Sequence, residues 1–195
     1  MERKTLVKPL APQKQSDADF QDPKNSENLI KIRVTKKTIS EEQLVQYARK
    51  KMFIMKPKIL SVEFFYQSCW RVVLDFKVAY FKETRADRGQ VEFIVDPRKG
   101  CGANEEELAL DLISKRVPLE MISDVDVEKG EAERKAKVDA RWKVLLARYK
   151  KPAELELAEI TQFYRPYYMA KVSWGSKTGI QYLAADDFAN YFVYN

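Results

Sequence analysis

Two stretches of this chain repeat the same order of features, and this repetition constrains the fold more than any other property of the sequence. In each stretch a helix pattern ends near a proline, a strand pattern containing Phe-Tyr follows, and a return strand ends near an aspartate. The Phe-Tyr pairs are Phe65-Tyr66 in VEFFYQSCW and Phe163-Tyr164 in ITQFYRPYY. Apolar residues at helical spacing favour an amphipathic helix, and β-branched or aromatic runs favour strands. The sequence therefore predicts a duplicated helix-and-hairpin unit.

Local signals place the individual elements. Strands are predicted at residues 29–35, 61–78, 90–96, 160–174, 180–184 and 191–194. Helices are predicted at about residues 40–56, 104–116 and 131–150, and turns at 86–89 and 175–179. The first helix opens on a capping box of Ser40 and Gln43. Its apolar stripe comprises Leu44, Ala48, Met52 and Met55, and the long third helix is expected to bury Val138, Trp142, Leu145 and Tyr149.

These elements predict an α+β fold of two related units, each with a helix packed on a curled antiparallel sheet. Residues 1–28 contain three prolines among polar side chains and are predicted to form a flexible N-terminal tail. The first α+β unit is placed at 29–128 and includes the short helix and an acidic connector. The second unit is placed at 129–195.

A helix on a curled antiparallel sheet, in tandem, resembles the layout of PepSY-like and cystatin-like modules. The resemblance covers most of residues 40–195 and rests on element order and the Phe-Tyr strands. PepSY-like modules are usually found outside the cytoplasm, where they often inhibit or chaperone a partner, so the resemblance implies a binding role. This chain departs from the family because its first twenty residues contain no apolar signal-peptide core.

The composition argues against several chemistries. The chain has no histidine and two cysteines, which argues against imidazole-based catalysis and against Cys-only zinc sites. It has no glycine-rich phosphate loop, and the adjacent carboxylates Asp186 and Asp187 are read as a strand-end turn. We therefore predict no cofactor, no metal and no catalytic residue; a carboxylate-based enzyme is the third hypothesis. Cys69 and Cys101 are read as reduced thiols, and no apolar run of about 18 residues occurs, which predicts a cytoplasmic protein without a membrane partner.

Aromatic strand residues carry the preferred functional hypothesis, a non-catalytic module that binds a protein partner or forms a homo-oligomer. Tyrosine and tryptophan are favoured at interfaces, although large aromatics also commonly pack in cores. The candidate partner-binding residues are Phe65, Tyr66, Trp70, Tyr164, Tyr167 and Tyr168.

Basic residues on the long helix carry the alternative hypothesis, a nucleic-acid-binding protein. The chain has a net charge of +6, and four basic residues of the 131–150 helix fall within about 60° of one another at 100° per residue. Such a stripe could follow phosphates, or it could be a solvated helix edge. The candidate phosphate-binding residues are Arg134, Lys137, Arg141 and Arg148.

Overall fold

The chain folds as a strand-dominated open sheet with one long helical segment on it. The computed structural model describes residues 28–43, 58–79, 86–104 and 110–186. In these residues the strands are β1 (Leu29–Thr35), β2 (Lys58–Ala79), β3 (Ala86–Asp96), β4 (Gly100–Asn104), β5 (Leu112–Pro118), β6 (Glu154–Trp174) and β7 (Lys177–Ala184). The helical elements are η2 (Leu119–Met121), α2 (Lys129–Asp139), η3 (Ala140–Leu145) and α3 (Leu146–Tyr149). The α+β class is confirmed.

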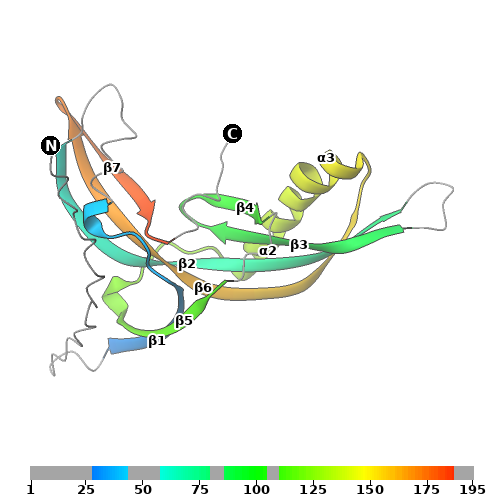
Figure 1. Ribbon diagram of the computed structural model, residues 1–195, viewed down its shortest axis with the longest axis horizontal. Coiled ribbons are helices and arrows are strands. Elements are labelled where there is room, and N and C mark those ends of the chain that lie inside the picture. Colours follow the sequence, from blue (N-terminus) through cyan, green and yellow to red (C-terminus); the bar gives the residue numbers. More distant parts are fainter. Residues whose placement is uncertain (1–27, 44–57, 80–85, 105–109, 187–195) are drawn as a thin grey trace, which may run out of the picture.

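Two long strands form the middle of the sheet. β2 has 22 residues and β6 has 21, and they pair antiparallel along nearly their whole length, from Lys58↔Ser173 to Lys77↔Glu154. β3 returns along the C-terminal half of β2, and β7 returns along the C-terminal half of β6. The sheet order is β4-β3-β2-β6-β1-β5, with β7 also paired to β6. The result is an elongated, strongly curved sheet (Figure 1).

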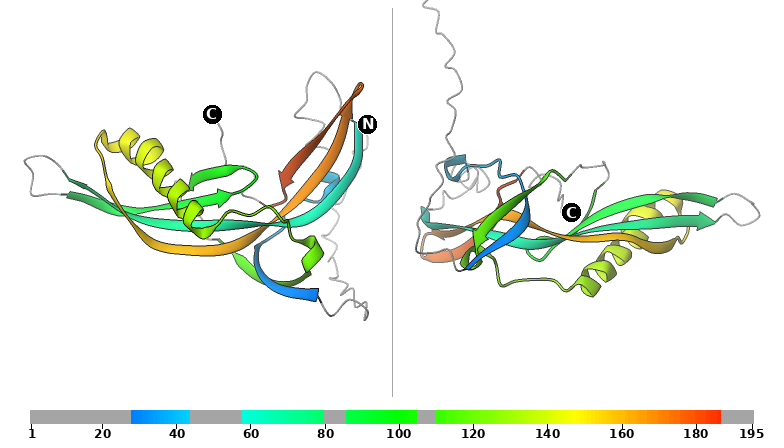
Figure 2. Two further views of the ribbon diagram at one scale, coloured as in Figure 1. Left: turned by 180° about the vertical axis from the view of Figure 1, so that it is seen from behind. Right: turned by 90° about the horizontal axis from the view of Figure 1, so that it is seen from below.

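A short ribbon crosses the middle of this sheet. β1 pairs antiparallel with β5 over seven residue pairs and touches β6 through the parallel pair Val34↔Tyr164. Its inward side chains Ile32 and Val34 pack with Val117 and Tyr66 in a separate small core. In the view from below, the β1–β5 ribbon and the helix that begins with α2 lie on opposite sides of the centre of the molecule (Figure 2).

The long helix packs on one face of β2 and β3 through alanines. Ala132, Ala136 and Ala140 are fully buried in a core that also contains Val72, Leu74, Phe93 and Val95. Alanine has a small side chain, so the helix can lie close to the sheet without a gap. Leu145 and Tyr149 continue this contact against Phe76.

A π-helical segment shifts the buried face of this helix. The inward positions 132, 136 and 140 are four residues apart, but the next is Leu145, because η3 is a π-helix with an extra residue in its turn. The prediction that Val138 and Trp142 are buried is wrong, because each follows an inward alanine by two residues and so lies on the opposite side of the helix. Val138 is 46% exposed and Trp142 is 63% exposed. The prediction for Leu145 is confirmed, and Tyr149 is half-buried.

Several other predictions can be scored. The capping box is confirmed, since Ser40 N donates to Gln43 Oε1 at 2.9 Å and Gln43 N donates to Ser40 Oγ at 3.3 Å. The predicted helix at 104–116 is wrong in its described part, because residues 112–118 form β5 and pair with β1. The predicted turn at 86–89 is also wrong, because these residues begin β3. Pairing with distant strands overrides the local charge pattern in both places.

Some predictions fall on residues outside the described part of the chain. These are the tail up to residue 27, the stripe of Leu44, Ala48, Met52 and Met55, and the strand at 191–194. The division into units at 29–128 and 129–195 stays a prediction. Strands from both ranges belong to the same sheet.

The alanine face gives a test of the helix position. Ala136→Leu should lower the free energy of unfolding by about 1–3 kcal/mol, because added methylenes have no room against the sheet. Val138→Leu is the matched control and should change it by less than about 0.5 kcal/mol, since its side chain points outward. Urea unfolding followed by circular dichroism measures both. Equal effects of the two variants would contradict this placement of the helix.

Candidate functional site

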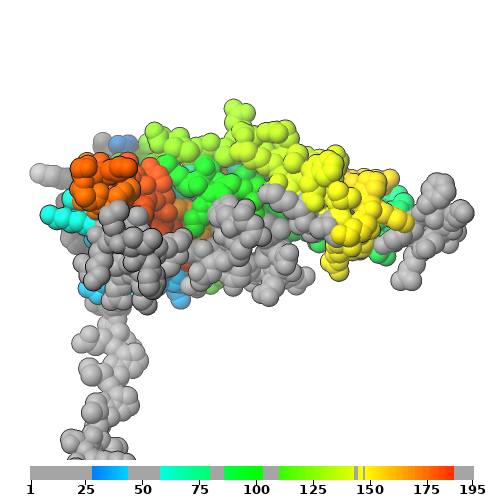
Figure 3. All heavy atoms as spheres, turned by 90° about the horizontal axis from the view of Figure 1, so that it is seen from above, coloured from blue at the N-terminus to red at the C-terminus, as the bar shows by residue number. Residues whose placement is uncertain are grey.

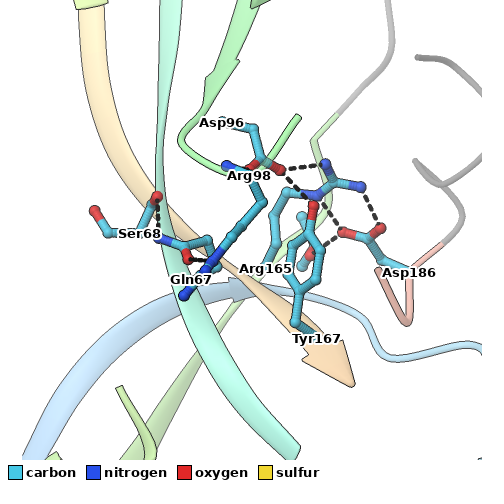
Figure 4. Close-up of polar contacts among 8 residues, drawn as sticks. Gln67, Ser68, Asp96, Arg98, Arg165, Tyr167 and Asp186 are labelled. Atoms are coloured by element: carbon cyan, nitrogen blue, oxygen red, sulfur yellow. Dashed lines mark hydrogen bonds and ion pairs between the residues drawn. The ribbon is translucent and has the colours of Figure 1, made fainter. Parts of the chain in front are cut away.

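One cluster of charged side chains in the described structure is completely buried. Arg165 lies in the middle of β6 with a side-chain exposure of 0%. Its Nη1 donates to Asp96 Oδ2 at 2.9 Å, while its Nε and Nη2 donate to the two carboxylate oxygens of Asp186 at 2.9 and 2.7 Å. Asp96 ends β3, and Asp186 follows the end of β7 (Figure 4). We call these three residues the Arg165 cluster.

Neutral donors complete the Arg165 cluster. One guanidinium and two carboxylates leave a formal charge of −1, so the carboxylates need further hydrogen bonds in a site away from water. Tyr167 Oη donates to Asp96 Oδ2 at 2.6 Å, and Thr35 Oγ1 donates to Asp186 Oδ2 at 2.7 Å. Arg98 N donates to the other oxygen of Asp96 at 2.8 Å. The cluster therefore ties together residues from β1, β3, β6 and the end of β7.

The environment of the cluster favours the protonated forms of two neighbouring side chains, Cys69 and Tyr167. Burial, with a contribution from the carboxylate of Asp96, raises the pKa of the Cys69 thiol well above its ordinary value. Burial also raises the pKa of Tyr167, an effect that Arg165 opposes and Asp96 reinforces. The pKa of Arg165 is raised as well: burial would lower it, but its partner Asp186 outweighs that effect. A thiol in this state is a weak nucleophile, so the cluster favours a structural role over a chemical one.

A second polar group holds the segment that leads into α2. Gln67 is buried directly opposite Arg165 in the β2–β6 register, and its Nε2 donates to the carbonyl of Val125 at 2.6 Å. Arg98 Nε donates to Gln67 Oε1 at 3.0 Å, and its Nη2 donates to Ser123 Oγ at 3.1 Å. The guanidinium carbon of Arg98 lies 4.2 Å from the ring centroid of Tyr182. The chain just before α2 is thus fixed to the sheet.

The outward side of the helix carries an exposed apolar and basic surface. Val138 and Trp142 are four residues apart and largely exposed. Arg134 and Arg141, both exposed, are four and three residues from Val138 on the same helix, a spacing that places side chains side by side, and Arg141 directly precedes Trp142. We call these four residues the Trp142 face. In the space-filling view the atoms of α2 to α3, light green to yellow, form an open ridge along the molecule (Figure 3).

The predicted partner-binding aromatics are divided between core and surface. Tyr66, Tyr167 and Tyr168 are buried, so another molecule could reach them only after a rearrangement of the sheet. Phe65, Trp70 and Tyr164 are half-buried. Phe65 stacks on Tyr167 with ring centroids 5.8 Å apart, and Trp70 Nε1 donates to the carbonyl of Val127 at 2.6 Å. Their role in partner binding stays a prediction.

The predicted phosphate-binding residues mostly lie on the surface. Arg134, Arg141 and Arg148 are exposed, whereas Lys137 is half-buried and forms an ion pair with Glu133 at 2.6 Å. Sequence reasoning missed both the exposure of Trp142 and the joining of the two return-strand aspartates by Arg165. The joining of the two aspartates had a signal in the sequence, because each return strand was expected to end near an aspartate.

Removing Arg165 should strongly destabilise the fold. Arg165→Met leaves two carboxylates buried without their cation, and we expect a loss of about 3–5 kcal/mol in the free energy of unfolding. Lys77→Met, which breaks the exposed pair with Glu154, should cost less than about 1 kcal/mol. Chemical denaturation of both variants makes the comparison. Similar losses would show that the buried pairs are no more important than a surface pair.

Alkaline pH should weaken the fold through Tyr167. Its pKa is raised in the folded state, so above its ordinary value of 10.0 the unfolded chain loses this proton first. The free energy of unfolding should then fall with rising pH, by about 1.4 kcal/mol per pH unit for this residue. Tyr167→Phe should have a shallower decline between about pH 10 and 11, although it is less stable at neutral pH. Parallel pH profiles of variant and wild type would contradict this.

Neither a membrane-spanning helix nor a metal-binding cluster is found in the described residues. No helix in residues 28–43, 58–79, 86–104 and 110–186 has the length and apolar character needed to cross a membrane. Within the same residues, no group of three or more cysteine, aspartate or glutamate side chains is arranged to hold a metal ion. Comparison of the chain with protein-family models, with curated proteins and with solved structures finds no match.

Proposed function

We propose that this protein is a non-catalytic binding module that engages a protein partner through the Trp142 face. The exposure of Trp142 carries this proposal. A tryptophan that is 63% exposed leaves a large apolar surface in water, and Val138 enlarges that surface. Tryptophan and arginine are the residue types most enriched where interface energy concentrates, and both occur on this face.

The π-helical segment supports this proposal. Trp142 lies within this segment, two residues beyond the buried Ala140 and therefore on the outward side of the helix. The extra residue in η3 brings Leu145 back into the core after Ala140. Segments of π-helix occur often at functional sites.

The fixed position of the helix also supports the proposed binding function. The alanine face and the contacts of Gln67 and Arg98 fix α2 and the chain before it. A surface that is already ordered loses little conformational entropy when a partner binds.

The proposal includes a doubled scaffold, with related units at 29–128 and 129–195. In each hairpin an aromatic ring of the long strand covers a glycine of the return strand. A Cβ at Gly89 would lie 2.9 Å from the Phe76 ring, and one at Gly179 would lie 2.7 Å from the Trp174 ring. Both return strands also end at an aspartate of the Arg165 cluster. These parallels favour duplication and the PepSY-like layout.

A cytoplasmic location belongs to the same proposal. Cys69 is buried, Cys101 is half-buried, and neither forms a disulfide bond. Cysteines outside disulfide bonds suit a reducing compartment.

Nucleic-acid binding is the second candidate function. Arg134 and Arg141 share the exposed side of the helix with Trp142, and such a group could hold phosphates while the indole stacks on an unpaired base. Binding of single-stranded DNA or RNA that weakens steeply with salt, and that is lost in Trp142→Ala, would favour this candidate.

Photo-crosslinking tests the proposed function. With benzoylphenylalanine at position 138, we expect a crosslink to another protein in the cells that produce this chain, and none from position 180, where the exposed Ile180 is the matched control. The crosslinked protein is then purified and titrated against the wild-type chain and variants. Trp142→Ala should weaken binding by about 30-fold, whereas Ile180→Ala should not. Crosslinks to nucleic acid, or none from position 138, would overturn the proposal.

A further inference from the structure

The charges around the Trp142 face indicate what kind of partner it accepts. Arg134 and Arg141 are seven residues apart, which places them about 10 Å apart along the helix. The side chain of Arg134 is 68% exposed, and its contact with Glu131 is long, at 4.0 Å. Val138 lies between the two arginines in sequence, and Trp142 follows Arg141. The face thus presents two cations around an apolar centre.

Neighbouring lysines on the helix are engaged within the chain. Lys135 Nζ lies 2.8 Å from Glu131 Oε1, and Lys137 Nζ lies 2.6 Å from Glu133 Oε1. The hydrogen bond from Lys135 lowers the pKa of Glu131, as expected for a carboxylate already used by a cation. Within the Trp142 face, the positive charge presented to another molecule therefore comes from Arg134 and Arg141.

This pattern fits an acidic protein segment better than a nucleic acid. A phosphate backbone carries closely spaced charges, whereas the two arginines of the face lie about 10 Å apart along the helix. Val138 offers a nucleic acid neither charge nor a stacking surface. A peptide can supply both an apolar side chain for Val138 and Trp142 and carboxylates at the spacing of the arginines. Arginine pairs well with carboxylates, because its planar donors match their geometry.

We infer that the Trp142 face binds an acidic segment of another protein. One or two apolar side chains of that segment cover Trp142 and Val138, and its carboxylates pair with Arg134 and Arg141. The inference rests on the proposed function and adds the chemistry of the partner.

Four labelled probes test it by fluorescence anisotropy against the full chain. They are an amphipathic peptide with leucines at helical spacing flanked by glutamates, the same peptide with lysines for glutamates, the same peptide with serines for leucines, and single-stranded DNA. We expect the first peptide to bind at least tenfold more tightly than the other three. Trp142→Ala should lose most of this binding.

Charge reversal separates the inference from the proposed function. The double substitution Arg134→Glu and Arg141→Glu should weaken binding of the acidic peptide by about tenfold or more and strengthen binding of the lysine peptide. Lys31→Glu with Lys171→Glu makes the same change in net charge at exposed positions of β1 and β6 and should have little effect. If Trp142→Ala abolishes binding of the crosslinked partner while the arginine reversal leaves it intact, the binding function stands and the acidic partner is wrong. If the DNA binds best, or if the acidic peptide fails to bind, the inference is overturned.

Discussion

The fold depends on one buried arginine that joins the ends of two hairpins. Arg165 reaches Asp96 at the end of β3 and Asp186 just after β7, so both return strands must end at the same place. A buried ion pair adds little net stability, because desolvation of the charges offsets their attraction. Its effect is on specificity: a sheet whose register slipped would leave one carboxylate buried without its cation. The Arg165 cluster thus selects this arrangement of the sheet over alternatives with similar apolar burial.

Register at the centre of the sheet determines where the helix can lie. Gln67 faces Arg165 across the β2–β6 pair, and through Gln67 and Arg98 the chain before α2 is fixed to the sheet. The alanine face then brings the helix close to β2 and β3. With its start fixed and Leu145 held in the core, the helix needs an extra residue in η3. Trp142 points outward because Ala140, two residues earlier, faces the sheet, so its exposure is a consequence of the alanine packing.

Local sequence signals predict those parts of the fold that depend on near neighbours. The strand at 29–35 matches β1, the Ser40 capping box is present, and the long helix has nearly its predicted extent. The parts that fail depend on distant residues. A helical pattern at 104–116 gives way to β5 because β1 supplies a strand partner, and a uniform helical period cannot reveal a π-segment. The partners of Arg165 are 69 and 21 residues away, so composition alone cannot identify it as a buried cation.

Proteins usually expose charged groups and bury large apolar ones, and two sites in this molecule do the reverse. The difference between these two sites bears on function. At the Arg165 cluster, charged groups are buried, but the arginine and both aspartates all have hydrogen-bond partners within the described part of the chain. At the Trp142 face, a large apolar side chain is left in water, and no described part of the chain covers it. The first site is complete within the chain. The second would be stabilised by another molecule that removed Trp142 and Val138 from water. For this reason we propose the helix, and not the aromatic strands, as the surface that meets a partner.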